Sequence, residues 1–466
     1  MPLTTRILAS LLLLAVWPLL AQQPADLIVS ATQVVTMDAD RRIIENGAVA
    51  IRDGRILAVG PRTEIDKTYR AKQRIDQPQA LLTPGLINTH THAAMSLLRG
   101  LADDKPLQEW LERYIFPAEA RNVTPEFVRW GTRLAMLEMM LSGTTTFADM
   151  YYFEDEVATV TREAGMRGVL GQTIIGFPAP DFKSPAEALA GVEKFVSKWK
   201  GDALITPAVA PHAVYTNDDT TLRQAREIAD RHGVPLLVHV SETQVENTST
   251  YQKTGATPTG YLSRIGGIAK RSVFAHGVWM GIRDRQIARQ HGVGIAHCPS
   301  SNLKLGSGIL PIGEFLRFGI PVGLGTDGPA GSNNDFQLME EMDLASKIAK
   351  GTTNDPLALP AATVFEMATI MGARVLGMEE QIGSLEPGKR ADLITVSLGE
   401  PHAFPRHDAY SMLVYTLKGS DVRDVVIEGR VTIRDRKPLT LDPAEIFAKA
   451  AELRGRVEKS LKESKP

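Results

Sequence analysis

The sequence contains a single cysteine, Cys298, among its 466 residues. One thiol cannot form an internal disulfide, and it cannot supply the several thiolates of a structural zinc site. Any metal that the chain binds must therefore be held by imidazole and carboxylate groups. A chain of this length buries a large core, so it needs no disulfides for stability.

Aromatic residues are also few, and the net charge is small. Aromatic residues make up 6% of the chain, the formal net charge is -2, and no run of basic residues is interleaved with aromatic ones. These features give no reason to expect nucleic-acid binding. The remaining composition, 43% hydrophobic and 23% charged, is that of a globular protein with one large domain and a smaller companion.

The sequence lacks an uninterrupted apolar run of the about 20 residues that a membrane-spanning helix needs. Its N-terminal apolar run follows Arg6, is interrupted by Pro18 and ends at Ala21. A basic residue, an apolar stretch and a small residue in this order are typical of a signal peptide. We therefore expect a periplasmic or secreted protein, cleaved near Ala21 and without stable membrane insertion afterwards. An uncleaved anchor and a mis-assigned start codon are the alternatives.

Short apolar segments alternate with amphipathic helical patterns through the middle of the chain. Eight of these segments have the pattern of strands buried on both faces: Leu81–Ile87, Thr144–Ala148, Gly168–Thr173, Leu204–Ala210, Pro235–Val240, Ser272–Ala275, Gly292–Ala296 and Val322–Gly325. Eight strand–helix units predict an α/β fold of the TIM type, a (β/α)₈ barrel. The active site of such a barrel lies at the C-terminal ends of its strands.

Both ends of the chain are rich in short strands and turns. Asp53-Gly54, for example, separates two apolar runs and predicts a tight hairpin. We expect the two ends to meet as a small β-sandwich. The predicted parts are a signal peptide (1–21), a first part of the sandwich (22–83), the barrel (84–384), a second part of the sandwich (385–445) and a charged helical tail (446–466).

Side chains suited to metal binding and proton transfer follow four of the predicted strands. They are His90 and His92 after the first strand, His239 and Glu242 at the fifth, His276 at the sixth and Asp327 at the eighth. Residues two apart on an extended segment face the same way, so His90 and His92 can reach one ion. Each residue alone has a common structural explanation, but their shared place at the catalytic end of a barrel predicts one metal centre.

These residue types suit a hydrolytic reaction. Zinc and ferrous iron accept neutral imidazole nitrogen and carboxylate oxygen, and a catalytic ion keeps one position open for water. Lowering the pKa of that water from 15.7 to about 7 makes hydroxide available near neutral pH. Attack on an electron-poor ring carbon also requires protonation of a ring nitrogen and of the leaving amine. Glu242 is the natural carboxyl group to carry those protons.

Several longer stretches resemble the amidohydrolase superfamily. They include Pro84–His92, Leu98–Gly100, Phe116–Glu119, His239–Thr243, Ser301–Gly306, Gly325–Gly328 and Gly383–Leu393. Within that superfamily the sequence is similar to the branch of methylthioadenosine and S-adenosylhomocysteine deaminases, which is related to guanine deaminase and the triazine hydrolases.

The resemblance implies specific roles at the metal centre. The implied ligands of one divalent metal ion, zinc or alternatively ferrous iron, are His90, His92, His239 and Asp327. His276 would orient the attacking water, Asp327 would help to take its proton, and Glu242 would protonate the ring nitrogen.

The resemblance also implies substrate contacts. Trp110 would pack on a nucleoside and Glu119 would accept both ribose hydroxyls. His212 would contact the substrate, and Glu242 would contact its ring nitrogen. These roles predict a hydrolytic deaminase of adenine nucleosides such as methylthioadenosine or adenosine, which we expect to be a homo-oligomer.

One observation and two alternative functions leave the substrate open. Relatives that accept S-adenosylhomocysteine use arginines after the third strand to hold its carboxylate, whereas residues 168–190 contain no arginine and only Lys183 as a cation. We therefore expect S-adenosylhomocysteine to be a poor substrate. A guanine deaminase or a triazine hydrolase with the same metal site is the main alternative, and an inactive binding protein with the amidohydrolase fold is a remote one.

Overall fold

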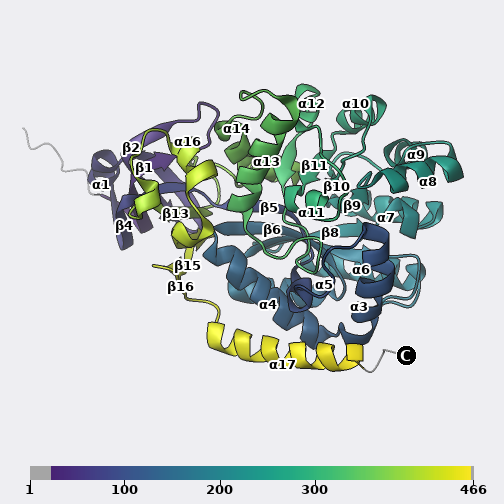
Figure 1. Cartoon of the computed structure of the whole chain (residues 1–466). Helices are drawn as coiled ribbons and strands as arrows, with labels where there is room; N and C mark the ends of the chain where they lie inside the picture. Colours follow the sequence, from purple (N-terminus) through teal and green to yellow (C-terminus); the bar gives the residue numbers. More distant parts are fainter. Residues whose placement is uncertain (1–21, 463–466) are drawn as a thin grey trace, which may run out of the picture.

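The computed structural model describes residues 22–462, so the predicted signal peptide lies outside the described residues. Within that range the strands form two sheets of eight strands each, which Figure 1 shows side by side. No helix in residues 22–462 combines the length and the apolar character that crossing a membrane requires.

The larger unit is a barrel of eight parallel strands, counted within residues 22–462, which confirms the predicted fold class. Its strands are hydrogen-bonded in chain order: β5 (Leu86–Thr91), β6 (Thr144–Tyr151), β7 (Arg167–Ile174), β8 (Ile205–Pro211), β9 (Leu236–Val240), β10 (Ser272–His276), β11 (Gly294–His297) and β12 (Val322–Leu324). The last strand returns to the first, because Asp327 N donates to His90 O at 3.0 Å and Thr89 Oγ1 donates to Leu324 O at 2.8 Å. These bonds bridge the remaining seam of the barrel.

Helices follow the strands and cover the barrel (Figure 1). From β5 to β9 they are η1 (Ala93–Leu98), α2 (Leu107–Glu109), η2 (Trp110–Ile115), α3 (Phe116–Asn122), α4 (Pro125–Leu141), α5 (Glu154–Ala164), α6 (Pro185–Trp199), η3 (Val214–Thr216) and α7 (Asp219–His232). After β9 they are α8 (Gln244–Thr254), α9 (Pro258–Arg264), α10 (Ile282–His291), α11 (Pro299–Lys304), α12 (Ile312–Arg317), α13 (Leu338–Thr353), α14 (Ala361–Met367) and α15 (Ile370–Val375).

Helix α7 shows how the local sequence sets these boundaries. The side chain of Asp218 accepts a hydrogen bond from Thr221 N, which satisfies a free amide of the first turn. Gly233 ends the helix in the left-handed conformation with φ 66°. The apolar side chains between these residues face the barrel strands.

The second unit is a mixed sheet built from both ends of the described chain. Its strands, in spatial order, are β16 (Lys437–Pro438), β15 (Arg430–Arg434), β14 (Val422–Ile427), β13 (Leu393–Ser397), β4 (Tyr69–Pro84), β1 (Gln23–Val35), β2 (Ile43–Arg52) and β3 (Arg55–Pro61). The short helices beside it are α1 (Arg62–Thr68), η4 (Pro401–Ala403), α16 (Ala409–Ser411), η5 (Met412–Thr416) and η6 (Gly419–Asp421). The pairing of β13 with β4 joins the two ends, and β2 and β3 form the hairpin predicted at Asp53-Gly54.

The segment Leu81–Ile87 does not form one strand, so this prediction was wrong. Leu81 to Pro84 belongs to β4 of the mixed sheet, and the first barrel strand begins at Leu86. The chain passes between the sheets at Gly85, where a Cβ atom would lie 2.1 Å from Thr145 Oγ1. Only glycine fits this close approach, and a continuous apolar run gives no sign of the change of sheet.

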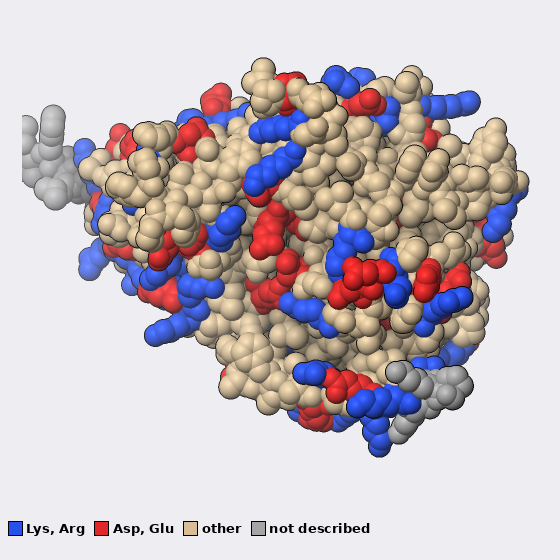
Figure 2. Space-filling model, viewed as in Figure 1, with Lys and Arg blue, Asp and Glu red and all other residues tan. Residues whose placement is uncertain are grey.

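The predicted C-terminal tail forms helix α17 (Pro443–Lys462), which lies along α4 and α3 (Figure 1). Ile446, Leu453 and Val457 are its buried side chains. Its outer side carries basic and acidic side chains in mixed order (Figure 2). The helix is therefore amphipathic and packs on the barrel through one apolar stripe.

A buried ion-pair network joins the barrel to the mixed sheet. Arg167, 1% exposed at the start of β7, contacts Asp392 Oδ2 through Nε at 2.6 Å and Glu428 Oε2 through Nη2 at 2.5 Å. Its Nη1 donates to Ala203 O at 2.9 Å. A charge this deeply buried is tolerated only when its partners are in place.

We expect Arg167→Met to lower the free energy of unfolding by about 3–5 kcal/mol, because it leaves two carboxylates without their buried partner. Urea unfolding measures this loss. Arg133→Met, which removes the partially exposed pair with Glu163, is the matched control and should cost about 0–1 kcal/mol. Equal losses in the two variants would contradict the role of Arg167.

Candidate active site

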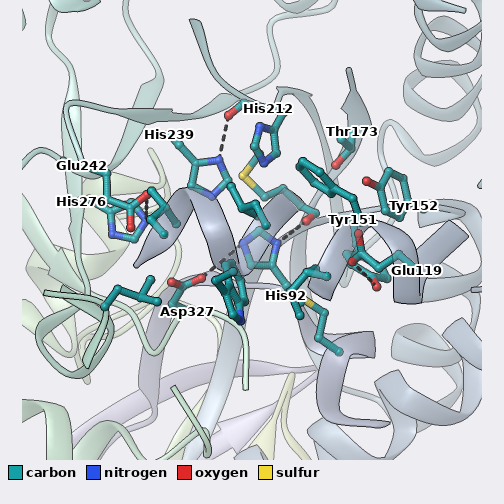
Figure 3. Close-up of a pocket in the computed structure, with 18 of the residues that line it drawn as sticks. His92, Glu119, Tyr151, Tyr152, Thr173, His212, His239, Glu242, His276 and Asp327 are labelled. Atoms are coloured by element: carbon teal, nitrogen blue, oxygen red, sulfur yellow. Dashed lines mark hydrogen bonds and ion pairs between the residues drawn. The ribbon is translucent and has the colours of Figure 1, made fainter. Parts of the chain in front are cut away.

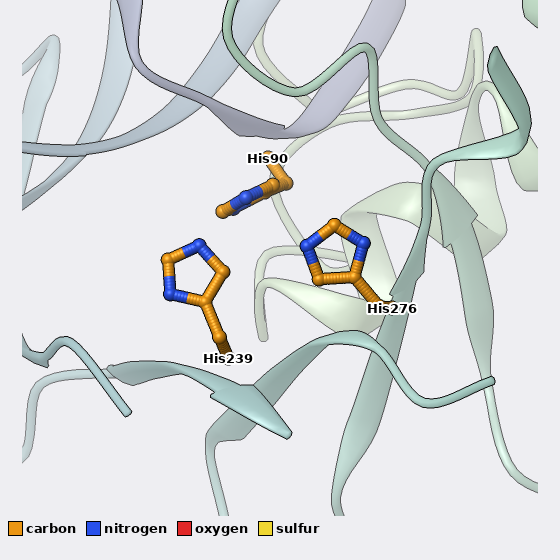
Figure 4. A group of neighbouring side chains, drawn as sticks. All are labelled: His90, His239 and His276. Atoms are coloured by element: carbon orange, nitrogen blue, oxygen red, sulfur yellow. The ribbon is translucent and has the colours of Figure 1, made fainter. Parts of the chain in front are cut away.

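The histidines predicted at the strand ends converge on one point inside the barrel (Figure 4). In one group, the nearest ligand atoms of His90, His239 and His276 all lie within 4.8 Å of one another. In a second group the same holds for His90, His92 and Asp327. His90 belongs to both groups, so the five side chains form one cluster.

Fixed oxygen atoms orient three of these rings. Nδ1 of His92 lies 2.7 Å from Met150 O, Nδ1 of His239 lies 2.8 Å from His212 O, and Nδ1 of His276 lies 2.9 Å from Asn302 Oδ1. Because a carbonyl oxygen can only accept, each Nδ1 carries the proton. In its neutral form each ring would therefore present an Nε2 lone pair, as a metal ligand must.

Asp327 is held on both of its carboxylate oxygens. Oδ2 accepts from Ser301 Oγ at 2.6 Å, and Oδ1 accepts from Gly328 N at 2.7 Å. Oδ1 also lies 3.4 Å from His90 Nε2 and 3.3 Å from His92 Nε2. The carboxylate thus places negative charge at the centre of the imidazole cluster.

The pKa values follow from burial and from this one carboxylate. Burial lowers the pKa of His90 to about 4 and that of His239 well below its usual value, so both rings are neutral near pH 7. Burial also lowers the pKa of His92, but the hydrogen bond and charge of Asp327 outweigh it and raise the value to about 9. A divalent cation binding between them would displace that proton.

The cluster fits a metal ion. Within residues 22–462, His90 Nε2 is buried and has no hydrogen-bond partner. A buried nitrogen without a partner lowers the stability of the fold, so such an atom calls for an explanation such as a bound ion. Neutral imidazole nitrogens with one carboxylate are the donor set that zinc and related divalent metals accept.

Three residues at the strand ends have a backbone conformation that usually requires glycine. Ser241, His276 and Asp327 have φ angles of 54°, 71° and 64°. Side chains in this left-handed region carry strain of about 1–3 kcal/mol each. His276 and Asp327 belong to the cluster. The strained backbone therefore lies where the chain leaves the barrel strands and orients these two side chains.

Glu242 lies beside the cluster. Its Oε2 lies 3.8 Å from His276 Nε2, and its Oε1 accepts from Ser307 Oγ at 3.2 Å. Glu246 supports the turn that carries it, since its carboxylate accepts from Ser241 N at 3.0 Å and Glu242 N at 2.8 Å.

The predicted substrate contacts line the same chamber (Figure 3). Glu119 is buried and accepts from Tyr151 Oη at 2.7 Å, and burial raises the pKa of Glu119 to about 7. The indole of Trp110 donates to Ala330 O at 2.8 Å and forms part of the wall. His212 lines the chamber with Nδ1 3.1 Å from Thr216 Oγ1.

The chamber is small in this conformation. Its volume is about 50 Å³. Residues of η2 and α3, from Trp110 to Glu119, form one of its walls.

Sequence reasoning missed several residues of the site. They are Tyr151 and Tyr152 beside Glu119, Glu246 and Ser307 around Glu242, and Ser301 and Asn302 behind the cluster. The spacing Thr243-x-x-Glu246, typical of a capping box, could have singled out Glu246. Ser301 and Asn302 lie in the stretch Ser301–Gly306 that carries the family resemblance, which gave them no role. No sequence signal marks Tyr151, Tyr152 or Ser307, because their partners are distant in the chain.

Comparison with known proteins agrees with this geometry. A sequence model of the amidohydrolase family matches residues 81–432, and one of a bacterial imidazolonepropionase-like composite domain matches residues 47–70. The chain belongs to the amidohydrolase family. The predicted resemblance is confirmed, and this amidohydrolase is a hydrolase of carbon–nitrogen bonds.

Individual relatives are similar along nearly the whole chain. A methylthioadenosine/S-adenosylhomocysteine deaminase of Syntrophobacter fumaroxidans is 46% identical, covering 91% of this chain and 96% of its own length. A zinc-containing crystal structure of an adenosine deaminase from Xanthomonas campestris is 38% identical with a TM-score of 0.92, covering 94% of this chain and all 100% of that one. An atrazine chlorohydrolase of Arthrobacter aurescens with zinc is 25% identical with a TM-score of 0.85, covering 92% and 100%. The donor set of this amidohydrolase and its similarity to zinc-containing structures therefore both indicate a divalent metal site.

We expect Ser301→Ala to weaken metal binding about 10–100-fold, because Asp327 Oδ2 loses the hydroxyl that fixes it. Competition with a chromogenic chelator measures the metal affinity without any assay of activity. Ser300→Ala is the matched control, since the backbone N–H and the side chain of Ser300 both bond to Glu341 and not to Asp327. If both variants bound metal as tightly as the unmodified chain, Ser301 would have no such role.

Proposed function

We propose that this amidohydrolase deaminates adenine nucleosides, such as methylthioadenosine and adenosine, and uses zinc as its divalent metal. One observation carries the proposal: Glu242 and Glu119 lie in one buried chamber on opposite sides of the histidine cluster (Figure 3). A carboxyl beside the cluster suits the reacting ring, and a carboxyl at the far side suits a sugar that bears paired hydroxyls. The names of the relatives support the same substrate class.

For the metal we assign His90, His92, His239 and Asp327 as ligands. The orphaned Nε2 of His90 and the orientation of the other rings support this set. A zinc ion held there supplies a Lewis acid that makes a water molecule nucleophilic near neutral pH.

The residues around the metal would then handle the attacking water. His276, whose ring is fixed by Asn302, holds the water through Nε2 and directs it toward the ring carbon. Asp327 Oδ1, at the centre of the cluster, is placed to receive the proton that the water loses. Both groups are buried, so bulk water does not compete for these contacts.

Glu242 would move the remaining protons. Burial raises its pKa, which favours a protonated carboxyl that can donate to the ring nitrogen as attack begins. The water oxygen becomes bonded to the ring carbon and the carbon–nitrogen bond to the amino group breaks. The amino group leaves as ammonia after gaining a proton through the same carboxyl group.

The remaining contacts position the nucleoside. Glu119, supported by Tyr151, would accept the two ribose hydroxyls, while Trp110 packs on the nucleoside and His212 contacts the base. Glu119 favours a nucleoside over guanine or a bare triazine, neither of which has a hydroxyl pair. All four proposed ligands are present and converge, which argues against an inactive binding protein.

The function is tested by measuring the ammonia that the zinc-loaded protein releases from adenosine, methylthioadenosine, guanine and melamine. We expect turnover of adenosine and methylthioadenosine, and Glu242→Gln should lower kcat by about 10²–10⁴-fold because it removes the proton carrier. Glu227→Gln, an exposed glutamate on α7, is the matched control, and the zinc content of both variants should equal that of the unmodified chain. Turnover of only guanine or melamine would keep the metal mechanism and overturn the substrate.

Export and self-association are also proposals, and they rest on the sequence. The basic residue, apolar run and small residue before Gln22 support cleavage near Ala21. Mass spectrometry of protein from the periplasmic fraction should give a mature chain that begins at about Gln22. Cytosolic protein that retains residues 1–21 would contradict export, and light scattering of the mature chain decides whether it is an oligomer.

A further inference from the structure

One short segment contacts all three groups that would hold the water or move protons in the proposed reaction. It consists of α11 and the turn that follows it, residues 299–307, and we call it the supporting segment. Three of its side chains each bond to one of those groups: Ser301 Oγ to Asp327 Oδ2 at 2.6 Å, Asn302 Oδ1 to His276 Nδ1 at 2.9 Å, and Ser307 Oγ to Glu242 Oε1 at 3.2 Å. A displacement of this segment would therefore disturb all three contacts together.

Hydrogen bonds within the supporting segment join its three contacting residues. Leu305 N donates to Ser301 O at 3.0 Å, and Ser307 N donates to Asn302 O at 2.9 Å. Helix α11 has only six residues, and a helix this short is not stable without contacts to other parts of the protein. The position of the segment must therefore be set by bonds to neighbouring elements.

Glu341, on helix α13, fixes the start of the supporting segment. Its side chain is buried, and its Oε2 accepts from Ser300 N at 3.0 Å. Amide groups in the first turn of a helix have no partner within the helix, so this carboxyl group acts in the place of an N-cap. The bond uses the backbone of Ser300, so it does not depend on the side chain of that residue.

The other carboxyl oxygen of Glu341 fixes the loop that carries Asp327. Its Oε1 accepts from Asn333 Nδ2 at 3.1 Å, and the same Nδ2 donates to Thr326 O at 2.9 Å. Thr326 directly precedes Asp327 in the sequence. One carboxyl group thus connects α11 to the loop of the metal-binding aspartate.

Glu341 has no direct part in binding. It lines neither the chamber nor the cavity of about 720 Å³ beside it. Burial raises the pKa of Glu341 to about 8, and the bonds from Ser300 and Asn333 oppose that shift. Burying a carboxyl group is unfavourable unless donors surround it, and the donors here belong to the two segments that Glu341 connects.

We infer that Glu341 is a positioning residue for the reaction. It acts through the supporting segment, whose side chains hold Asp327, His276 and Glu242. The effect on turnover rests on the proposed function, whereas the effect on the metal ligand Asp327 can be measured without any substrate. The alignment of the site therefore depends on a carboxyl group that lies outside the chamber.

Glu341→Gln tests the inference, because it keeps the volume of the side chain but turns an amide donor toward Asn333. Competition with a chromogenic chelator should show metal binding weakened about tenfold, since Asp327 is held less firmly. For adenosine, kcat should fall about tenfold while KM changes less than about twofold, because no contact with the substrate is lost. Glu340→Gln, at the exposed neighbouring position on α13, is the matched control and should change neither value.

A double-mutant cycle shows whether Glu341 acts through Ser301. In a chain that already carries Ser301→Ala, Glu341→Gln should weaken metal binding less than about twofold, because the bond that Glu341 supports is absent. If the two residues acted independently, their separate losses of metal affinity would multiply. This comparison separates positioning of the site from a general contribution to folding.

The possible results separate this inference from the function on which it rests. Unchanged metal affinity in Glu341→Gln, or losses that multiply in the double variant, would overturn the inference. A Glu341→Gln chain that does not fold, as judged by urea unfolding, would make the role of Glu341 structural and would overturn it as well. If the unmodified chain deaminates no adenine nucleoside, the proposed function fails, and the metal affinities still decide the inference.

Discussion

Burial of several imidazole rings around one carboxylate is the constraint on which this structure depends. His90 Nε2 and His92 Nε2 lie 3.4 Å and 3.3 Å from Asp327 Oδ1, and His90 and Asp327 are buried. Such a group is unfavourable unless each atom has a partner or a metal ion neutralises the carboxylate. The surrounding protein must therefore keep these side chains from moving apart. It does so through backbone and side-chain hydrogen bonds of the barrel around them.

The seam of the barrel is one of these devices. The strands that carry His90 and Asp327 are the first and the last of the barrel, and the backbone bond from Asp327 N to His90 O crosses their junction. Asn88 reinforces it, because its side chain donates to Thr326 Oγ1 at 2.8 Å and accepts from Thr326 N at 3.1 Å. The same hydrogen bonds that close the barrel therefore also bring His90 and Asp327 together.

The mixed sheet and α17 contribute from a distance. Arg167 ties the start of β7 to the mixed sheet, away from the C-terminal ends of the strands where the cluster lies. Helix α17 packs on α3, which carries Glu119 of the chamber wall. The ion pairs of Arg167 therefore fix the base of the barrel, and α17 supports the helix that carries Glu119.

The sequence by itself determined the barrel and the metal-binding residue types. Alternating apolar strands and amphipathic helices recur locally, and the spacing of His90 and His92 follows from the geometry of one strand. Most strand positions could be predicted for this reason. The strand Leu81–Ile87 could not, because an apolar run is the same whether it continues in one sheet or crosses at Gly85 into another.

Only the tertiary structure decided how the site is supported and what lies above it. Ser301 meets Asp327 across 26 residues, and Tyr151 meets Glu119 across 32. A cavity beside the chamber likewise brings together Phe177 and Trp279, which are distant in the sequence. Contacts of this kind depend on how distant strands are arranged around the barrel axis, and no local periodicity records that arrangement.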